Sequence, residues 1–384
     1  MSSLKFQVKY SVLFLCLGFF FINFSFLDDA IRQLIAFSCF AIVIGLSFFE
    51  NLKDISKGQL RSYFIGSAVL IYTILLSGFI EPVGEYGQNK YLYFLFVGYL
   101  GFVAFPSMLK YKKSIILFSK SLFYTSLIFC FIAIIFADVN GGRRSELGLN
   151  AAILARITAI PAIYASCELY FKKFSFKNLF FIFLSAGAIF FTGTKTPIPV
   201  FLFSFFLIAS KGSTLKVKVK YFFLLVVTIV SFLLLLIYAV PKSFSDRILD
   251  PDGLSYESQT TSGNRFDLYI TSIEAIPEVP LGAGFGGFTK FHSYILAPHN
   301  IVFEIAIELG IICLIFFLIW IFKILNIIKK TAFNNQYSMF LAVLFLYFLI
   351  SAQFGGELTI QNLLLYILGS YFYNYFSDEH NEIV

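Results

Sequence analysis

The residues best suited to chemistry lie in and beside one polar stretch, residues 241–298, which interrupts an otherwise apolar sequence. Arg265 lies within this stretch, and a His299-Asn300 pair follows it directly. An unperturbed histidine titrates at about pH 6.5, so His299 is a candidate base for a hydroxyl group, with a structural role at a helix start as the alternative. Long loops of this kind are usually functional or disordered. Because this one carries apolar residues that can pack, we interpret it as functional.

The composition is that of an integral membrane protein. Hydrophobic residues make up 59% of the 384 residues and charged residues only 13%, against about 25% charged residues in a soluble domain. Apolar runs of about 18 residues or more are long enough to cross a bilayer as helices. The five cysteines lie inside such runs without metal-like spacing, so we interpret them as core residues. The sequence therefore predicts an all-α membrane fold.

Apolar runs alternate with polar breaks along the chain and predict about twelve spans. The expected spans cover residues 10–27, 32–49, 63–80, 91–109, 115–137, 150–170, 178–192, 197–210, 221–240, 299–322, 337–355 and 361–376. The breaks alternate between cation-rich and cation-poor, and cation-rich loops stay in the cytoplasm. Both termini are therefore expected in the cytoplasm, with residues 241–298 as one long periplasmic loop between spans nine and ten. This topology also explains the net charge of +7 without a nucleic-acid partner.

The spans are expected to form a single polytopic membrane domain over residues 1–384, because no internal repeat is visible. The first run lacks the small-residue cleavage site of a signal peptide, so it is expected to be retained. Short amphipathic helices are expected within the long loop. One such run, Arg265 to Ile276, could lie along the membrane surface.

Four further cations lie on the expected outer side, where topology selects against them: Arg143, Arg144, Arg156 and Lys195. An ionisable group at the bilayer centre costs about 2.5–3.5 kcal/mol, so it is a functional candidate by default. Snorkelling to lipid phosphates is the alternative for each. Cations gathered at an outer membrane surface indicate an anionic ligand. A lipid diphosphate fits, because its tail lies in the bilayer and its charged group at the interface.

The glycine-rich run from Pro280 to Gly287 permits positive φ angles close to a ligand. Gly282 and Gly284 are therefore candidate binding residues, together with Asn300. The run lacks the Lys-Ser/Thr of a nucleotide-binding loop. The outer breaks show no acidic metal-binding pattern, since Asp250-Pro251-Asp252 is better explained as a turn. We expect no metal and no cofactor, with side-chain cations neutralising the diphosphate.

Taken together, these residues resemble the bacterial O-antigen ligase and polymerase family of membrane glycosyltransferases. The resemblance is strongest over residues 140–310 and rests on short motifs in a fixed order: Gly148-Leu149-Asn150, Thr192-Gly193-Thr194-Lys195, Arg265…Tyr269, Ile276 to Pro280, Gly282-x-Gly284, His299-Asn300 and Glu308-Leu309-Gly310. Two positions depart from the family pattern. Lys195 stands where the family usually has Ser-Arg, and Tyr269 stands where it usually has tryptophan.

The resemblance implies a GT-C-like helical bundle and a metal-independent, inverting glycosyl transfer at the periplasmic face of the inner membrane. The donor would be an undecaprenyl-diphosphate-linked oligosaccharide. Arg265 and Lys195 would hold the diphosphate with help from Arg143 or Arg144, and His299 would act as base or orient the acceptor. The acceptor would be a lipid-linked repeat unit in a polymerase and lipid A-core in a ligase. A chain-length regulator is a further expected partner.

A polymerase is the first expectation, because a sequence rich in Phe, Ile and Lys is typical of surface-polysaccharide gene clusters. A ligase shares the motifs and the chemistry and differs only in its acceptor. The third alternative is a flippase or transporter of lipid-linked oligosaccharides. Transporters place their polar sites near the bilayer midplane, often on paired halves, whereas here the informative residues lie at one face.

Overall fold

The structure of the chain is a computed structural model. It describes residues 29–51, 57–99, 112–135, 151–172, 175–192, 214–220, 263–292, 295–354 and 363–375, with isolated residues between 10 and 18, at 109 and 202, and between 222 and 230. Within these ranges the regular structure is helical and no strand is assigned. The predicted all-α class is confirmed for this part of the chain.

The helices follow the predicted apolar runs and one part of the predicted loop. In chain order they are α2 (Asp29–Asn51), α3 (Lys57–Phe79), α4 (Gly84–Tyr99), α6 (Lys112–Ile135), α7 (Ala151–Thr158), α8 (Ile160–Phe171), α9 (Phe176–Phe191), α13 (Gly263–Ala275), the short 3₁₀ turns η3 (Ile276–Glu278) and η4 (Gly287–Lys290), α14 (Ile301–Glu304), the π-helix η5 (Ile305–Leu309), α15 (Ile311–Thr331), α16 (Gln336–Ser351) and α17 (Leu363–Tyr375). Helix α13 lies where the sequence predicts a short helix inside the loop.

Several of these helices could cross a membrane. Among the described residues, three stretches are long and apolar enough by length and composition: Lys112–Ile135, Ile153–Phe171 and Ile311–Thr331. Shorter apolar helices lie at Leu34–Val43, Phe64–Phe79, Phe176–Phe191, Gln336–Ser351 and Leu363–Tyr373. Most of the predicted spans at 10–27, 197–210 and 221–240, and the loop before residue 263, lie outside the described residues. The number of spans and their orientation stay predictions.

One predicted boundary is wrong. The apolar run 299–322 is expected as one span, but the structure divides it at Gly310. Gly310 has a φ angle of +87°, which residues other than glycine rarely adopt. The helical segment before Gly310 therefore ends there. A new helix, α15, begins at Ile311 and continues to Thr331, beyond the predicted end.

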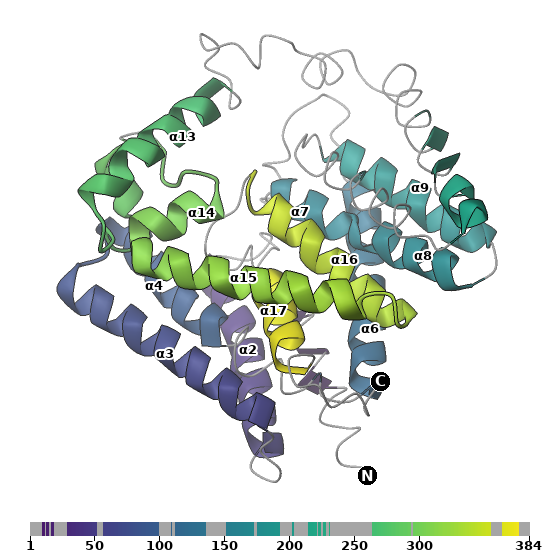
Figure 1. Cartoon of the computed structure of the whole chain (residues 1–384), viewed down its shortest axis with the longest axis horizontal. Helices are drawn as coiled ribbons and strands as arrows, with labels where there is room; N and C mark the ends of the chain where they lie inside the picture. Colours follow the sequence, from purple (N-terminus) through teal and green to yellow (C-terminus); the bar gives the residue numbers. More distant parts are fainter. Residues whose placement is uncertain are drawn as a thin grey trace. The chain divides into compact units, whose positions relative to one another are not determined.

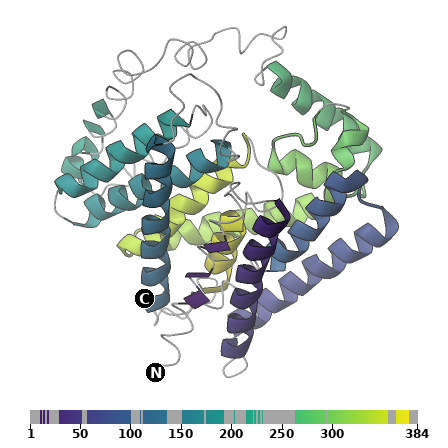
Figure 2. The same ribbon diagram turned by 180° about the vertical axis from the view of Figure 1, so that it is seen from behind.

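The chain forms two compact units. Unit 1 comprises Met1–Glu50, Tyr111–Asp250 and Thr331–Tyr347, and unit 2 comprises Asn51–Lys110, Pro251–Lys330 and Phe348–Val384. In unit 1, helices α6, α7, α8 and α9 pack against one another (Figure 2). Their core contains Phe129, Cys130 and Ala133 from α6, Leu154 from α7 and Ala188 from α9.

Unit 2 contains the described part of the predicted loop, residues 263–292 and 295–298. Helices α3 and α4 lie side by side, and α17 contacts both (Figure 1). A core cluster of this unit contains Leu268 and Ala275 from α13, Ala283 and Phe288 from the glycine-rich run, and Ile307 from η5. From residue 263 on, the predicted loop is therefore folded against the π-helix η5.

Gly369 of α17 tests the packing between α15 and α17. A Cβ atom added to Gly369 would lie 2.4 Å from Cη2 of Trp320 on α15, so Gly369→Ala must displace one of the two helices or the indole ring. We expect the variant to lose about 1–3 kcal/mol of unfolding free energy, as overpacked contacts do. The measurement is the Tm of the purified protein in detergent.

Gly187→Ala on α9 is the matched control. A Cβ atom there meets nothing within 4 Å, and alanine is the better helix former by up to about 1 kcal/mol. Its Tm should stay equal or rise. An unchanged Tm for Gly369→Ala would show that the helices do not approach this closely.

Candidate functional site

Asn300 caps the short helix α14. Its backbone is extended, and its side-chain Oδ1 accepts hydrogen bonds from the backbone N–H groups of Val302 (2.9 Å) and Phe303 (3.3 Å). Asparagine is a preferred N-cap because its short side chain reaches these otherwise free groups. Its Nδ2 donates to the Gln353 carbonyl oxygen at 3.3 Å. The side chain is thus engaged as a cap, and its contact with substrate stays a prediction.

His299 directly precedes this cap and has a rare backbone conformation. Among the residues that the structure describes, it is the one non-glycine residue with positive φ, at 54°. Such a conformation costs about 1–3 kcal/mol and persists only where the surroundings impose it. The next two residues do so, because Asn300 caps α14 and the Ile301 N–H donates to the Ala352 carbonyl oxygen at 3.1 Å. The strain falls on the histidine that the sequence selects as candidate base.

Helix α13 is fixed to the same point. The Tyr269 hydroxyl donates to the Gln353 carbonyl oxygen at 3.1 Å, so this oxygen accepts from both Tyr269 and Asn300. The Tyr269 ring also contacts the Phe303 ring, with 5.5 Å between centroids. Arg265 lies in the first turn of α13, one helical turn before Tyr269. The structure therefore brings the helix that carries Arg265 to the His299-Asn300 turn.

The glycine loop, residues 281–287, docks onto the π-helix η5. The Ala283 N–H donates to the Ile307 carbonyl oxygen at 2.6 Å, and the Gly284 N–H donates to that of Glu308 at 3.2 Å. Gly282 and Gly284 have φ angles of +100° and +82°, and a Cβ on Gly282 would lie 2.6 Å from the Glu308 oxygen. Both glycines are buried. Their close approach is to the protein's own backbone, while their predicted contact with substrate stays a prediction.

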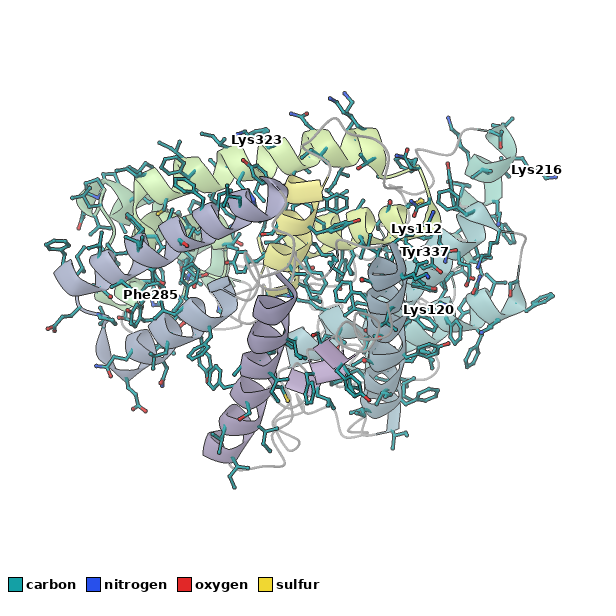
Figure 3. All side chains as sticks on the ribbon, turned by 90° about the horizontal axis from the view of Figure 1, so that it is seen from below. Lys112, Lys120, Lys216, Phe285, Lys323 and Tyr337 are labelled. Atoms are coloured by element: carbon teal, nitrogen blue, oxygen red, sulfur yellow. The ribbon has the colours of Figure 1, made fainter. Side chains whose placement is uncertain are left out.

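The other side of the glycine loop contacts α4. The Val83 N–H donates to the Phe285 carbonyl oxygen at 2.9 Å. The Phe285 ring, labelled in Figure 3, is fully buried against the rings of Tyr91 and Phe94, with centroid distances of 5.6 and 5.5 Å. A Cβ on Gly87 would lie 2.4 Å from the Phe285 oxygen. The loop thus lies between α4 and η5 in contact with both.

Three buried charged side chains join α4 to the segment formed by α14 and η5. Lys90 of α4 forms ion pairs with Glu304 and with Glu308, the latter at 2.6 Å between Nζ and Oε1. The lysine side chain is 1% exposed and both carboxylates are 0% exposed. Burial alone would lower the pKa of Lys90, but the carboxylates of Glu304 and Glu308 raise it well above its ordinary value. Lys90 therefore stays charged, and its Nζ also lies 5.5 Å from the centre of the Tyr86 ring.

The end of η5 is fixed by two more contacts. The Tyr72 hydroxyl of α3 donates to the Leu309 carbonyl oxygen at 2.5 Å, and the Ile311 N–H donates to that of Pro280 at 3.0 Å. A helix leaves its last carbonyl groups without partners of its own. Here the glycine loop supplies them for Ile307 and Glu308, and Tyr72 supplies one for Leu309.

The predicted site residues are distributed over both units. His299 and Asn300 lie at the start of the 300–310 segment in unit 2, Gly282 and Gly284 contact the end of that segment or the residues around Ile80, and the backbone of Arg265 belongs to the same unit. Arg156 lies in α7 of unit 1 and is buried, with 2% exposure. Three predicted cations, Arg143, Arg144 and Lys195, lie outside the described residues.

The motifs do not identify Lys90 or Glu304, and they include Glu308 only as a family landmark. A signal for them exists in the sequence. Glu304 and Glu308 are four residues apart inside an apolar run, so they share a helix face at a depth where charge is costly. Lys90 offers no such signal, because 218 residues separate it from Glu308.

A comparison with protein families matches residues 180–318 to the family described as O-antigen ligase. A comparison with curated proteins finds no match. The matched range includes α13, the glycine loop, the His299-Asn300 turn and the two buried carboxylates. Together with the long apolar helices, it indicates a multi-pass membrane protein. Residues 180–318 thus match an O-antigen ligase family domain, which supports the resemblance to the O-antigen ligase and polymerase family that the motifs indicate.

Proposed function

We propose that the protein is a surface-polysaccharide polymerase that joins undecaprenyl-diphosphate-linked oligosaccharide repeat units. The transfer takes place at the periplasmic face of the inner membrane, inverts the anomeric centre and needs no metal. The family match supports a glycosyltransferase and disfavours the flippase alternative. The preference for a polymerase rests on the Phe-, Ile- and Lys-rich composition.

The observation that carries the proposal is the pair of hydrogen bonds to the Gln353 carbonyl oxygen. Through Tyr269 and Asn300, they connect the helix that carries Arg265 to the turn that carries His299. Glycosyl transfer from a diphosphate needs a base for the acceptor hydroxyl and cations for the leaving group in one neighbourhood. An arginine helix joined to a histidine turn meets this requirement.

In the proposed reaction the acceptor oxygen attacks the anomeric carbon from the side opposite the diphosphate. The new bond forms between these two atoms as the bond from the anomeric carbon to the diphosphate oxygen breaks. The hydroxyl proton passes to His299, and the negative charge that develops on the diphosphate is neutralised by Arg265. Lys195 and Arg143 or Arg144 are proposed as further cations, and Arg156 as a buried one. A chain-length regulator is the proposed protein partner.

A ligase is the second candidate function, and the description of the matched family favours it. The donor, the base and the cations would be the same. The acceptor would be a sugar of lipid A-core instead of a second lipid-linked repeat unit.

Alanine substitutions at His299 and Arg265 test the proposed transfer. Removing one charge-stabilising donor typically lowers an enzymatic rate about 10²–10³-fold, and loss of the base acts on the same step. We expect either variant to accumulate in the membrane at the wild-type level but to restore no polysaccharide ladder in a strain deleted for the gene. The measurement is a gel of the extracted polysaccharide. His292→Ala is the matched control, because His292 stacks on Phe288 and accepts from the Ile295 N–H, and it should keep the ladder.

The same gel separates the two candidate functions. In the deletion strain, a single repeat unit still attached to core with the ladder gone identifies a polymerase. Complete loss of attached polymer, with long chains on the undecaprenyl carrier, identifies a ligase. A normal ladder with both alanine variants would overturn the transferase proposal itself.

Tyr269→Phe tests whether the Gln353 carbonyl joins the two parts of the site. The substitution keeps the ring against Phe303 and removes one hydrogen bond, a change worth about 0.5–1.5 kcal/mol. We expect the transfer rate of the purified protein to fall by up to about tenfold. Tyr124→Phe, at an exposed tyrosine of α6, should leave the rate unchanged. Equal rates for Tyr269→Phe and the wild type would show that this bond positions nothing.

A further inference from the structure

The three buried charges of Lys90, Glu304 and Glu308 have no part in the proposed chemistry. Taking charged groups out of water offsets most of what their attraction provides, so a buried ion cluster contributes little net stability compared with well-packed apolar residues. Such a cluster instead favours the one conformation in which all its charges are paired. Any other conformation, like the removal of one member, leaves a buried charge uncompensated.

The cluster lies directly behind the His299-Asn300 turn. Glu304 follows Asn300 by one helical turn, and its N–H donates to the Asn300 carbonyl oxygen at 3.0 Å. Glu308 lies one turn further on, where its carbonyl oxygen accepts from the glycine loop. One segment, residues 300–310, thus carries the cap of the candidate site at its start and both carboxylates along its length.

Without Lys90 this arrangement is unfavourable. Two carboxylates four residues apart on one helix face repel each other, and the repulsion is larger in a buried site than in water. Lys90 contacts both, so a single ammonium group from α4 holds the two carboxylates together. The 300–310 segment is therefore tied to α4 at two successive turns, in one rotational setting about its own axis.

We propose that Lys90 is a positioning residue for the proposed transfer: by bridging Glu304 and Glu308 it fixes the 300–310 segment and thereby places His299. This inference rests on the proposed function. Lys90 is buried and touches no reacting atom in this scheme; it acts through the backbone that joins Glu304 to Asn300 and His299. The strained backbone of His299 depends on that support, because its conformation is imposed by its neighbours.

Lys90→Met is the first test, with Lys323→Met as its matched control. Lys323, labelled in Figure 3, is an exposed lysine of α15. Its Nζ lies over the Tyr373 ring, 5.8 Å from the ring centre. The assay uses purified protein and lipid-linked repeat units extracted from the deletion strain. For Lys90→Met we expect kcat to fall about 100-fold, as a displacement of about 1 Å at a reacting group can cause. The KM for the lipid-linked donor should change less than about threefold, because the proposed diphosphate cations are unaltered.

Hydrogen exchange provides a readout that does not depend on catalysis. If Lys90 fixes the segment, the backbone amides of residues 300–310 should exchange faster in Lys90→Met than in the wild type, with α15 unchanged beyond its first turn. Lys323→Met should show neither effect.

The neutral triple variant Lys90→Met, Glu304→Gln, Glu308→Gln separates positioning from stability. It removes all three charges together and leaves no uncompensated one, so its Tm should return close to that of the wild type. We expect its kcat to stay at least about tenfold below the wild type, because the amides and thioether provide no ionic bridge. Recovery of both the Tm and kcat would overturn the proposal and leave the cluster a purely structural role.

Failure of this inference is distinguishable from failure of the proposed function. If His299→Ala abolishes transfer while folded Lys90→Met has the kcat and hydrogen exchange of the wild type, only the positioning role is wrong. If His299→Ala transfers normally, the proposed function is wrong, and the exchange measurement still shows whether Lys90 fixes residues 300–310.

Discussion

The docking of the glycine loop onto the end of the π-helix is the constraint on which the rest of unit 2 depends. The last carbonyl groups of a helical segment have no partners within it, and leaving them buried without partners is costly. The N–H groups of Ala283 and Gly284 occupy two of them. The glycine loop and the end of η5 approach this closely because Gly282 and Gly310 have no side chains. A Cβ at Gly282 would lie 2.6 Å from the Glu308 carbonyl oxygen, and one at Gly310 would lie 2.6 Å from the Leu281 carbonyl carbon.

This constraint gives a physical reason for the order of the motifs. The Asn300 cap and Gly310 are the two ends of one helical segment. The glycine loop and Lys90 both contact this segment. A cap is needed where the segment begins and a residue of positive φ where it ends. Glu308 lies just before that end, where its side chain meets Lys90 and its backbone meets the loop. Asn300, Glu308 and Gly310 thus each have a backbone or packing role in addition to any contact with substrate.

Much of the helical fold could be predicted from apolar runs, because each run is long and its polar breaks are clear. The division at Gly310 could not, since hydropathy continues through it and the break depends on backbone geometry. For the candidate site, His299 and Asn300 can be selected from the sequence, because the ability to titrate and the ability to cap a helix are properties of the residue type. The structure shows Gly282 and Gly284 approaching the carbonyl ends of η5 and the residues around Ile80, which residue type does not indicate, and their approach to a ligand stays a prediction. Lys90 cannot be selected in this way, because 218 residues separate it from Glu308 in the sequence and its other partner, Glu304, is similarly distant.

The strained His299 gives these contacts a mechanistic meaning. A φ of 54° in a residue with a side chain costs about 1–3 kcal/mol, and a chain free to relax would adopt a different conformation. Two hydrogen bonds oppose this relaxation: Ile301 donates to the Ala352 carbonyl, and Asn300 donates to the Gln353 carbonyl. The ion pair of Lys90 with Glu304, one helical turn after Asn300, opposes it as well. A base fixed in one orientation before the substrate arrives needs no reorganisation during proton transfer, which is where preorganised sites lower a barrier. Under the proposed function, the buried charges of unit 2 therefore serve the rate of transfer more than the stability of the fold.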